Sequence, residues 1–589
     1  MRKTRSVVAT SMDGVQENIE EHFRNKYQKL YNSADDSSEL LRVQIETENL
    51  VDKASIADVE RVTPEIVKQA VRKLKPGKSD PVFSFSTDCF KNATDPLFVM
   101  LSTIIQSCLI HSHVTQILLL ATLVPLIKDK LGSTNTSKNY RSIAISSILL
   151  KIIDWTFITL YGSTFALNDF QFAYQEDCST TMCTWAVLET VDYFMKSDSE
   201  VFTCAMDMTA AFDLTLHSLL FSKMIQKGFP PIFIRLFIFI YMYQTANVRW
   251  NGAISSEFPM SNGVRQGAIL SAIAYCFYME DLFALLKHRR AGCWVMDQYH
   301  GIFGYSDDNW LLAPSLAALQ DMLQTCEEYA LSHNLKFSTD PNPTKCKTKL
   351  MAFLKSPRPL PSLSLCGNTL PWVDKLKHLG NTIANVVDGC QLDIKVKNSM
   401  YISKNNAICQ ELYFANPNCK FKVNCIYNNH YTGSQLWLFG SKEMDKLEST
   451  YNRSIKIMFS LPWATHRNLL EPITETPHVR RILIQRYISF IKSIQKSKKK
   501  PLRNLLSLAK ADVRTITGSN LRYILLKSGK SNIDELFSSK VEIEYHKMND
   551  EQMWRVGLVK EIIDALHDEK TVGLEESELK DILEFLCVE

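Results

Sequence analysis

The sequence lacks the features that mark secreted and membrane-spanning proteins. Its fifteen cysteines include no CxxC pair, and the start of the chain, MRKTRSVVATSMDG, contains no apolar core of the kind that a signal peptide needs. No stretch reaches the roughly 18 uninterrupted apolar residues of a membrane helix, and Arg235 interrupts the nearest one, PPIFIRLFIFIYMY. We therefore expect free thiols and an intracellular protein of the nucleus or the cytoplasm, without a membrane span.

A zinc motif and internal repeats are also missing. The tightest group of metal-type side chains is Cys419, Cys425 and His430, and its spacing fits neither a zinc knuckle nor a zinc finger, which favours scattered thiols. The longest low-complexity tract is KSKKK, residues 496–500. That cluster is equally consistent with a nuclear address and with a phosphate-binding spot.

Size and charge indicate a multidomain globular protein with a basic segment. A chain of 589 residues is too long for one core, and 46% hydrophobic residues supply enough apolar material for several cores. The net charge of +4 hides an asymmetry: residues 478–530 hold fourteen Lys and Arg against one acid, whereas residues 531–589 hold sixteen acids against six bases. The basic block is of the kind that attracts nucleic acid, and a solvated helical face is the alternative explanation.

The secondary-structure pattern divides the chain into four parts. Residues 1–60 are polar, and we expect a helix and a linker there. Residues 61–385 form the second part: an amphipathic helix comes first, and from about residue 95 short β-like runs alternate with helical ones, which is an α+β pattern. Strand-like runs then thin out, so that we expect one helical region over residues 386–475 and a second one over residues 476–589, basic first and then acidic.

Acidic residues stand at the ends of strand-like segments. EVFTCAM reads as a buried strand that Asp207 closes, ahead of a helical run expected from about Thr209. Further on, Asp307 and Asp308 separate HGIFGY from NWLLA. A hairpin turn is one explanation, since Asp is common in two-residue loops. The other is a site where carboxylates converge around cations, because each pair would repel by about 4 kcal/mol at ~4 Å and an effective dielectric near 20.

Between these acids lies a glycine-containing loop, SNGVRQGAIL, that opens a long apolar helix. It carries Gly263 and Gly267. Glycine allows a backbone to come close to another group, and we expect that group here to be a bound ligand.

Eight segments follow one another in a recognisable order. They are LVPLIKDK (123–130), NYRSIAISSILLKIID (139–154), DFQFAYQEDCSTTMCTWAV (169–187), MDMTAAFD (206–213), NGVRQGAILSAIAY (262–275), YSDD (305–308), LKFSTDPNPTKCKTKLMAF (335–353) and WVDKLKHLGNTI (372–383). Together they resemble the finger and palm motifs of reverse transcriptases from non-LTR (LINE-type) retrotransposons.

The resemblance implies a fold and an activity. The fold would be a polymerase right hand: fingers and a palm with an antiparallel sheet, a helical thumb and a helical C-terminal region. The activity would be that of an RNA-directed DNA polymerase, a nucleotidyltransferase that acts on an RNA template, a DNA primer and dNTPs. Two Mg²⁺ ions, or Mn²⁺, would serve as cofactors, since hard carboxylate oxygens suit them. The oligomeric state stays open.

The resemblance also implies site residues. The catalytic and metal-binding acids would be Asp207, Asp307 and Asp308; of these, Asp308 would lie further from the ions, because adjacent residues of a strand point to opposite faces and only a turn would let both bind. The substrate-binding residues would be Phe212 as a steric gate against ribose, Gln266, Gly267, Arg141, Lys128 and Lys345. Lys347 is an alternative to Lys345, and Lys130 and Lys138 are alternatives to Lys128.

Two further interpretations are open. A catalytically inactive nucleic-acid-binding relic of a retroelement would keep the shape without turnover, and a metal-dependent nuclease would use the same acids but not the finger motifs. The roughly sixty residues ahead of the fingers are too few for an endonuclease domain. We therefore expect a truncated copy or a fragment that lacks the endonuclease.

Overall fold

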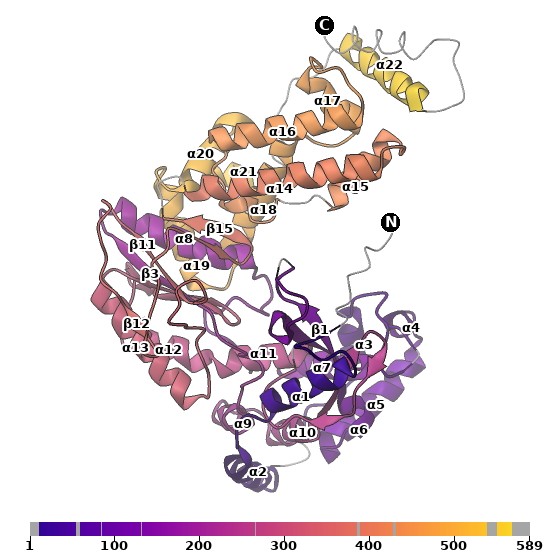
Figure 1. Cartoon of the computed structure of the whole chain (residues 1–589), viewed down its shortest axis with the longest axis vertical. Coiled ribbons are helices and arrows are strands. Elements are labelled where there is room, and N and C mark those ends of the chain that lie inside the picture. The colour runs from indigo at the N-terminus through magenta and orange to yellow at the C-terminus, as the bar shows by residue number, and fades with distance from the viewer. Residues whose placement is uncertain are drawn as a thin grey trace.

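The fold changes character at about residue 385: helices and strands alternate before it, and the described part of the chain after it is helical (Figure 1). The computed structural model describes residues 11–54, 59–83, 85–130, 132–265, 267–385, 389–427, 431–538 and 550–567. The α+β class and the helical C-terminal third that the sequence predicts are both observed.

The helices are α1 (Ile19–Tyr31), α2 (Ser37–Val51), α3 (Pro64–Arg72), α4 (Thr87–Lys91), α5 (Asp95–His111), α6 (Gln116–Leu119), α7 (Ile148–Tyr161), α8 (Thr180–Lys196), α9 (His217–Gln226), α10 (Pro231–Met242), α11 (Ile269–Tyr278), α12 (Glu280–His288), α13 (Leu316–Ser332), α14 (Gly389–Glu411), α15 (Pro417–Tyr427), α16 (Lys442–Met458), α17 (Arg467–Thr474), α18 (Val479–Lys496), α19 (Lys500–Ala511), α20 (Ile516–Ser528), α21 (Ile533–Ser538) and α22 (Asp550–His567), with 3-10 turns at Ser137–Asn139 and Ser434–Leu436.

The strands are β1 (Leu120–Ile127), β2 (Tyr140–Ile145), β3 (Val201–Met206), β4 (Thr245–Trp250), β5 (Ala253–Ile254), β6 (Phe258–Pro259), β7 (Trp294–Val295), β8 (Gln298–Tyr299), β9 (Ile302–Tyr305), β10 (Asp308–Ala313), β11 (Lys349–Phe353), β12 (Ser364–Leu365), β13 (Asn368–Thr369), β14 (Lys375–His378) and β15 (Asn381–Ala384).

The first sheet has the order β2-β1-β4-β5, with β6 on β4. β1 and β2 are antiparallel neighbours, whereas β1 and β4 are parallel, which requires the long connection through α7 to α10. Helix α1 packs on β4, and it buries Phe23, Tyr27 and Tyr31 there. The N-terminal segment, which we expected to be one helix and a linker, contains the two helices α1 and α2, and α1 completes the core of this sheet.

The second sheet, β11-β3-β10-β9, is antiparallel throughout. Its core strands are buried on both sides. On one face of the sheet, Trp310 packs edge-on against His378, which contacts Thr184 of α8. On the other face, Cys204 lies toward Cys326 of α13. The sheet is thus held between α8 and α13, and the residues at its ends are set by a rigid core.

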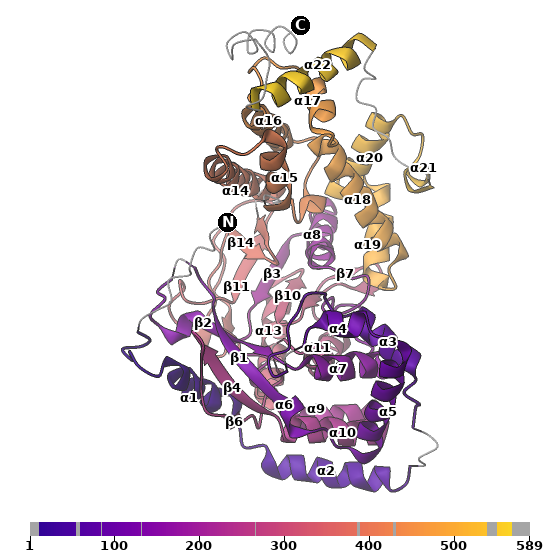
Figure 2. The same ribbon diagram turned by 90° about the vertical axis from the view of Figure 1, so that its right-hand side faces the viewer.

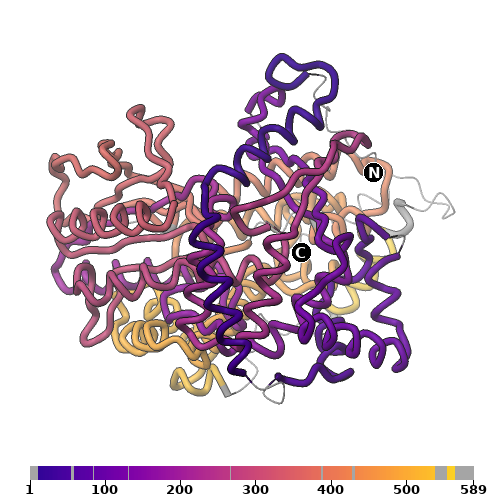
Figure 3. Tube along the Cα trace, turned by 90° about the horizontal axis from the view of Figure 1, so that it is seen from below, coloured from indigo at the N-terminus to yellow at the C-terminus, as the bar shows by residue number. Residues whose placement is uncertain are grey.

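The remaining N-terminal helices cover the first half of the molecule. Seen from below, α2 lies across the underside, where it packs on α9 and α10 (Figure 3). The Arg235 that interrupts the apolar α10 donates to Ser112 Oγ (2.7 Å) and to the carbonyl of Ile110 (2.9 Å). A cation is favourable at this place because α5 ends there.

One helical run of the described residues, Ile269–His288, is long and apolar enough to cross a membrane by length and composition alone. Two thirds of it, 67%, is buried inside the protein. This is the burial of a core helix, and the run carries α11 and α12 through the centre of the molecule.

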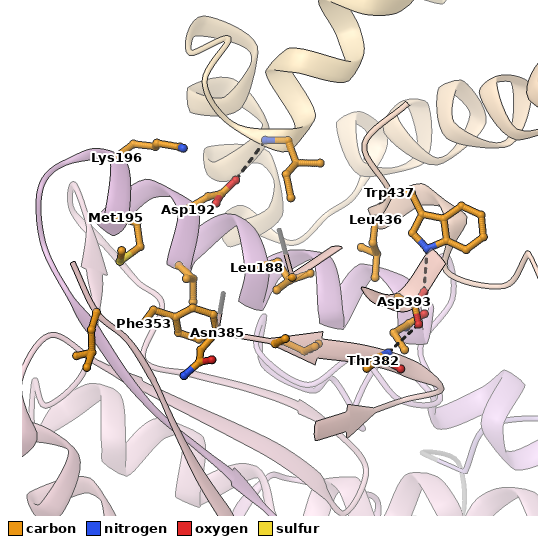
Figure 4. Close-up of a pocket in the computed structure, with 17 residues that line it drawn as sticks. Leu188, Asp192, Met195, Lys196, Phe353, Thr382, Asn385, Asp393, Leu436 and Trp437 are labelled. Carbon is orange, nitrogen blue, oxygen red and sulfur yellow. Dashed lines mark hydrogen bonds between the residues drawn. The ribbon is translucent and has the colours of Figure 1, made fainter. Parts of the chain in front are cut away.

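The C-terminal helices pack back onto the second sheet. In Figure 2, α18 and α19 lie next to α8, and both α19 and α20 contact α8. The junction with β15 surrounds a cavity of about 190 Å³ (Figure 4). At its rim Asp192 of α8 accepts the N–H of Ile516 (3.2 Å), and the buried Asp393 of α14 accepts the Trp437 indole N–H (2.8 Å) and the N–H of Thr382 (2.8 Å). Polar contacts therefore fix α14 and α20 to the sheet domain.

The cysteines of the described residues carry free thiols, as predicted. Cys419 and Cys425 are exposed. His430, the third member of the group considered in the sequence, lies outside the described residues.

Candidate active site

The neighbouring acids Asp307 and Asp308 sit at a two-residue hairpin between β9 and β10. Tyr305 pairs with Asp308 across the ladder, which leaves Ser306 and Asp307 as the turn. Ser306 adopts a positive φ of 63°, as tight hairpin turns require. The hairpin explanation is thus correct for the backbone, and it presents both carboxylates at the end of the second sheet.

The amide side chain of Gln171 fixes this turn. Its Oε1 accepts the N–H groups of Ser306 (2.9 Å) and Ala173 (3.0 Å), and the side chain is fully buried. The next residue, Phe172, donates its N–H to the carbonyl of Gly304 (2.8 Å), so this segment runs beside β9. Gln171 lies in one of the motifs quoted above, but sequence reasoning assigned it no role.

Asp207 follows the last residue of β3 and lies beside the hairpin. Met206 pairs with Asn309, so Asp207 comes next to Asp308 where the two strands end. The N–H of Asp207 donates to Thr348 Oγ1 (3.2 Å), and its carbonyl accepts from the segment before β11. Asp207 is therefore held from both sides, and the three acids that the sequence singles out meet at one end of the second sheet.

Burial and mutual repulsion raise the pKa of both hairpin acids. For Asp307 the largest cause is burial; the negative charge of Asp207 adds to it, and Arg141 opposes it. For Asp308 burial, followed by repulsion from Asp307 and Asp207, raises the pKa to about 6. The three carboxylates thus interact directly, in a site where their charges are incompletely compensated.

The hairpin acids face different sides, as adjacent residues near a strand do. The negative charge of Asp307 helps to raise the pKa values of Tyr275 and Cys276 of α11. The negative charge of Asp308 helps to raise the pKa of Cys183 of α8. Asp307 therefore lies on the α11 side of the sheet, and Asp308 lies toward α8.

A lysine from the segment before β11 pairs with Asp207. Lys347 Nζ lies 3.4 Å from Asp207 Oδ2, and its side chain is 66% exposed. Lys345 is exposed two residues earlier, in a turn where its N–H donates to Asn342. The structure thus brings Lys347, the alternative left open in the sequence, to the acids.

Two further cations come from the first sheet. Lys128 follows β1, and Arg141 lies on β2. Arg141 lowers the pKa of Asp307. The pKa of Lys128 is lowered by burial first and then by Lys347 and Arg141, while Asp207 opposes the shift. The first sheet therefore presents positive charge to the acids of the second.

Phe212 lies in a turn rather than on a helix. The helix expected from Thr209 begins at His217 instead. The carbonyl of Phe212 accepts the N–H of Val264 (2.7 Å) and is not available to a helix. The half-buried Phe212 ring stacks on Tyr275 of α11, with ring centroids 4.5 Å apart.

The loop before α11 approaches protein backbone where we expected a ligand. At Gly263 a Cβ would lie 2.6 Å from the carbonyl oxygen of Asp213, and at Gly267 it would lie 2.6 Å from that of Ala144. Both glycines also have positive φ values, 84° and 111°. The loop therefore joins the Phe212 turn to β2. Gln266, predicted to bind substrate, lies outside the described residues.

The acids fit a divalent cation by their chemistry. Asp207 Oδ2 is a buried carboxylate oxygen that accepts no hydrogen bond in the described part of the protein, and the Lys347 ammonium lies 3.4 Å from it. Among the described residues, no group of three or more His, Cys, Asp or Glu is arranged so that it could hold a metal ion, so the predicted set of Asp207, Asp307 and Asp308 does not form a preformed three-ligand site. Mg²⁺ commonly takes one or two carboxylates and completes its shell with water and substrate phosphates, which matches this set.

A fourth acid, Asp213, was missed in the sequence. It is 6% exposed, and burial raises its pKa to about 6, although the Tyr31 hydroxyl and the Lys128 ammonium oppose the shift. It lies in the same motif as Phe212, but its neighbour Tyr31 belongs to the distant helix α1. Asp213 links that helix to the cationic side of the site.

The basic cluster KSKKK does not form one solvated patch. Lys498 and Lys500 are exposed, whereas Lys499 is only 4% exposed. A buried ammonium cannot exchange counterions with a bound polyanion. Lys499 is therefore not part of a phosphate-binding spot, and both interpretations of the cluster stay open for the exposed Lys498 and Lys500.

The segment that holds this site matches a known family. Residues 128–383 match the family described as "Reverse transcriptase (RNA-dependent DNA polymerase)". The match begins at Lys128 and ends within β15, and it contains Asp207, Asp307 and Asp308.

Individual proteins are more distantly similar. The chain is 22% identical over 444 residues to the "RNA-directed DNA polymerase from mobile element jockey" of Drosophila melanogaster. The aligned region covers 71% of this chain and 46% of that protein. The chain thus spans about half the length of the curated relative that it matches. An apo telomerase from Candida tropicalis, truncated from its C-terminal domain, aligns with a TM-score of 0.32 and 11% identity over 52% of this chain and 61% of that one.

Replacement of Asp308 by Asn tests whether burial, together with repulsion from Asp307 and Asp207, makes the ionisation of Asp308 oppose folding. In the metal-free protein we expect Asp308→Asn to stabilise the fold by roughly 1–2 kcal/mol at pH 8. The folded pKa of about 6 lies above the ordinary 3.8, so ionisation of Asp308 opposes folding. The gain is full above pH 6 and disappears as the pH falls toward 3.8. Thermal unfolding in EDTA between pH 4 and 8 measures it.

The matched control is Asp512→Asn, which has the opposite sign. A hydrogen bond from Arg514 lowers the pKa of Asp512 to about 2, so its ionisation favours folding and the variant loses stability at pH 8. Identical unfolding temperatures of Asp308→Asn and the wild type over the whole pH range would show that neither burial nor the other acids raise the pKa of Asp308.

Proposed function

We propose, from the match of residues 128–383 to the reverse transcriptase family, that this chain is an RNA-directed DNA polymerase that extends a primer 3′ end with dNTPs. The observation that carries the proposal is the meeting of Asp207 and Asp307 at one end of the second sheet, facing Arg141 and Lys128 of the first. The name of the jockey relative describes the same activity.

In this proposal the chain is built as a polymerase right hand. The first sheet with its helices would form the fingers, and the antiparallel sheet β11-β3-β10-β9 would form the palm. The helices from Gly389 to Thr474 would form the thumb, and those from Val479 onward the C-terminal region.

The acids would act as cation ligands. Asp207 and Asp307 would hold the divalent ions, and Asp308, which lies toward α8, would contribute from the edge. When bound, two Mg²⁺ or Mn²⁺ ions activate a primer 3′-hydroxyl and stabilise the leaving pyrophosphate. The raised pKa values of Asp307 and Asp308 support this role, because added positive charge relieves their repulsion.

The cations would bind the triphosphate. Arg141 offers a planar fork of donors to phosphate oxygens, and Lys128 offers a point charge. Lys347 or Lys345 would neutralise the departing pyrophosphate, and the 3.4 Å contact with Asp207 favours Lys347.

Phe212 would select the sugar. Its ring is held flat by the stack on Tyr275, near the turn that follows Asp207. A rigid ring at this place would clash with a ribose 2′-hydroxyl. Gln266, outside the described residues, stays predicted to bind the incoming nucleotide, whereas Gly267 lies against the Ala144 carbonyl.

Asp207→Asn tests the proposed activity. Primer extension on an RNA template should fall at least ~100-fold, because a carboxylate charge in the site is lost. Affinity for the RNA–DNA duplex should stay within about two-fold. The matched control is Glu200→Gln, just before the other end of β3, where Glu200 pairs with Arg358. Synthesis by Asp207→Asn at the wild-type rate would remove this acid from the site.

Phe212→Val tests sugar selection. The smaller side chain leaves room for a 2′-hydroxyl, so the ratio of kcat/KM for dNTP to that for rNTP should fall about 10-fold or more. Single-nucleotide incorporation measures this ratio. An unchanged ratio in an active variant would assign Phe212 to packing alone.

Lys347→Ala and Lys345→Ala form a matched pair. We expect Lys347→Ala to lower the rate of nucleotide incorporation about 10-fold, because its ammonium lies beside Asp207, and Lys345→Ala to lower it less than about two-fold. Rapid-quench kinetics on both variants decides. The reverse order would restore Lys345 as the pyrophosphate-binding lysine.

A further inference from the structure

Lys499 is a buried cation at an unusual place. It immediately precedes α19 and so lies at the positive end of the helix dipole, where a cation is unfavourable. It is 4% exposed, and burial lowers its pKa. A lysine retained under both penalties must have compensating contacts.

The ammonium group of Lys499 is fully hydrogen-bonded to one short segment. Its Nζ donates to the carbonyls of Asn168 (3.1 Å) and Gln171 (2.7 Å) and to Gln175 Oε1 (3.2 Å). An ammonium has three N–H donors, and all three are used here. The same Nζ lies 5.1 Å from the centre of the Phe172 ring. Lys499 thus closes the segment 168–175 into one conformation.

This segment is the one that fixes the acidic hairpin. The backbone carbonyl of Gln171 receives Lys499, while the side chain of the same residue receives the N–H of Ser306. The backbone of Gly304 is also paired, with Phe170 and Phe172 on the two sides of Gln171. Only one residue therefore separates the Lys499 ammonium from the turn that contains Asp307.

Helix α19 provides a fixed support for this contact. Trp185 of α8 donates its indole N–H to Thr517 Oγ1 (3.0 Å) at the start of α20, and Asn504 donates to the carbonyl of Val295 (3.2 Å). Asp192 adds its bond to Ile516, shown in Figure 4. The helices α19 and α20 are docked on the sheet domain at several points, so Lys499 has a defined position relative to β9 and β10.

We infer that Lys499 is a positioning residue for the acidic hairpin: by holding Gln171 it keeps the Ser306 turn, and hence Asp307, in the arrangement that binds divalent cations. The inference rests on the proposed function of that hairpin. It assigns to the C-terminal helices, which lie outside the family-matched residues 128–383, a direct part in organising the active site. Lys499 touches neither primer nor nucleotide and acts through Gln171.

The test compares Lys499→Met with Lys498→Met in the full-length chain. Both variants remove one ammonium from the same cluster, but only Lys499 is buried. At saturating template, Lys499→Met should lower kcat for single-nucleotide incorporation about 10- to 100-fold, as expected for misplaced reacting groups, with KM for dNTP within about two-fold. Lys498→Met should keep kcat within about two-fold.

Three measurements separate positioning from loss of folded protein. The burst amplitude reports the fraction of active enzyme, and it should stay unchanged in Lys499→Met while the burst rate falls. Lys499→Arg, which keeps the charge and several donors, should recover part of kcat. The double variant Lys499→Met/Gln171→Met should lose no more than Gln171→Met alone, because both act on one turn.

Mn²⁺ binding followed by electron paramagnetic resonance gives a readout without turnover. Lys499→Met should weaken Mn²⁺ binding several-fold, in the same direction as Asp307→Asn, and Lys498→Met should not. If the wild type extends no primer, the proposed function fails, while the Mn²⁺ comparison still decides this inference.

Two outcomes would overturn the inference. One is Lys499→Met with the kcat and the Mn²⁺ affinity of the wild type. The other is a loss confined to the burst amplitude, which would make Lys499 a folding residue. If Lys499→Met does not fold, Gln175→Leu, which removes one of the three acceptors, should show the same changes at smaller size, and unchanged kinetics in that variant would equally contradict the role.

Discussion

The antiparallel register of β3 and β10 is the constraint on which the site depends. It brings Asp207 next to Asp308 at the point where the ladder ends, and the hairpin adds Asp307 one residue away. A slip of one residue would turn every side chain of a strand to the other face. The buried residues further along, such as Trp310 and Cys204, make that slip prohibitive, so the hydrophobic core determines where three like charges meet.

The groups that compensate the negative charge of the three acids come from parts of the chain that are distant in sequence. Arg141 and Lys128 belong to the first sheet, Lys347 to the segment before β11, and Asp213 with Tyr31 ties helix α1 to the same region. The first sheet packs with α1 in a hydrophobic core separate from that of the second sheet, and these charged groups act between the two sheets. A ligand with many negative charges would bind between the two sheets. Its charge would pair with the cations of the first sheet, and divalent cations bound with it would neutralise the acids of the second.

Local sequence patterns were enough to place the acids, but not the residues that hold these acids in position or compensate their charge. Asp207 at a strand end and the Asp307 pair in a hairpin follow from alternation and turn chemistry, and the helical character after residue 385 follows from periodicity. The start of α9 was misplaced because the carbonyl of Phe212 bonds to the 262–264 loop, a partner that no local pattern reveals. The burial of Lys499 and the choice of Lys347 over Lys345 depend on contacts across the fold, and a charged residue looks solvated in any one-dimensional pattern.

The contacts of Lys499 also bear on where the working unit ends. The family-matched segment stops at β15, yet the acceptors on residues 168–175 are satisfied by an ammonium that arrives more than one hundred positions later. A chain trimmed to the family-matched segment would leave these oxygens without that donor. The boundary drawn by similarity and the boundary drawn by hydrogen bonding therefore differ: a chain that ends anywhere between β15 and Lys499 keeps the whole matched segment and loses this donor.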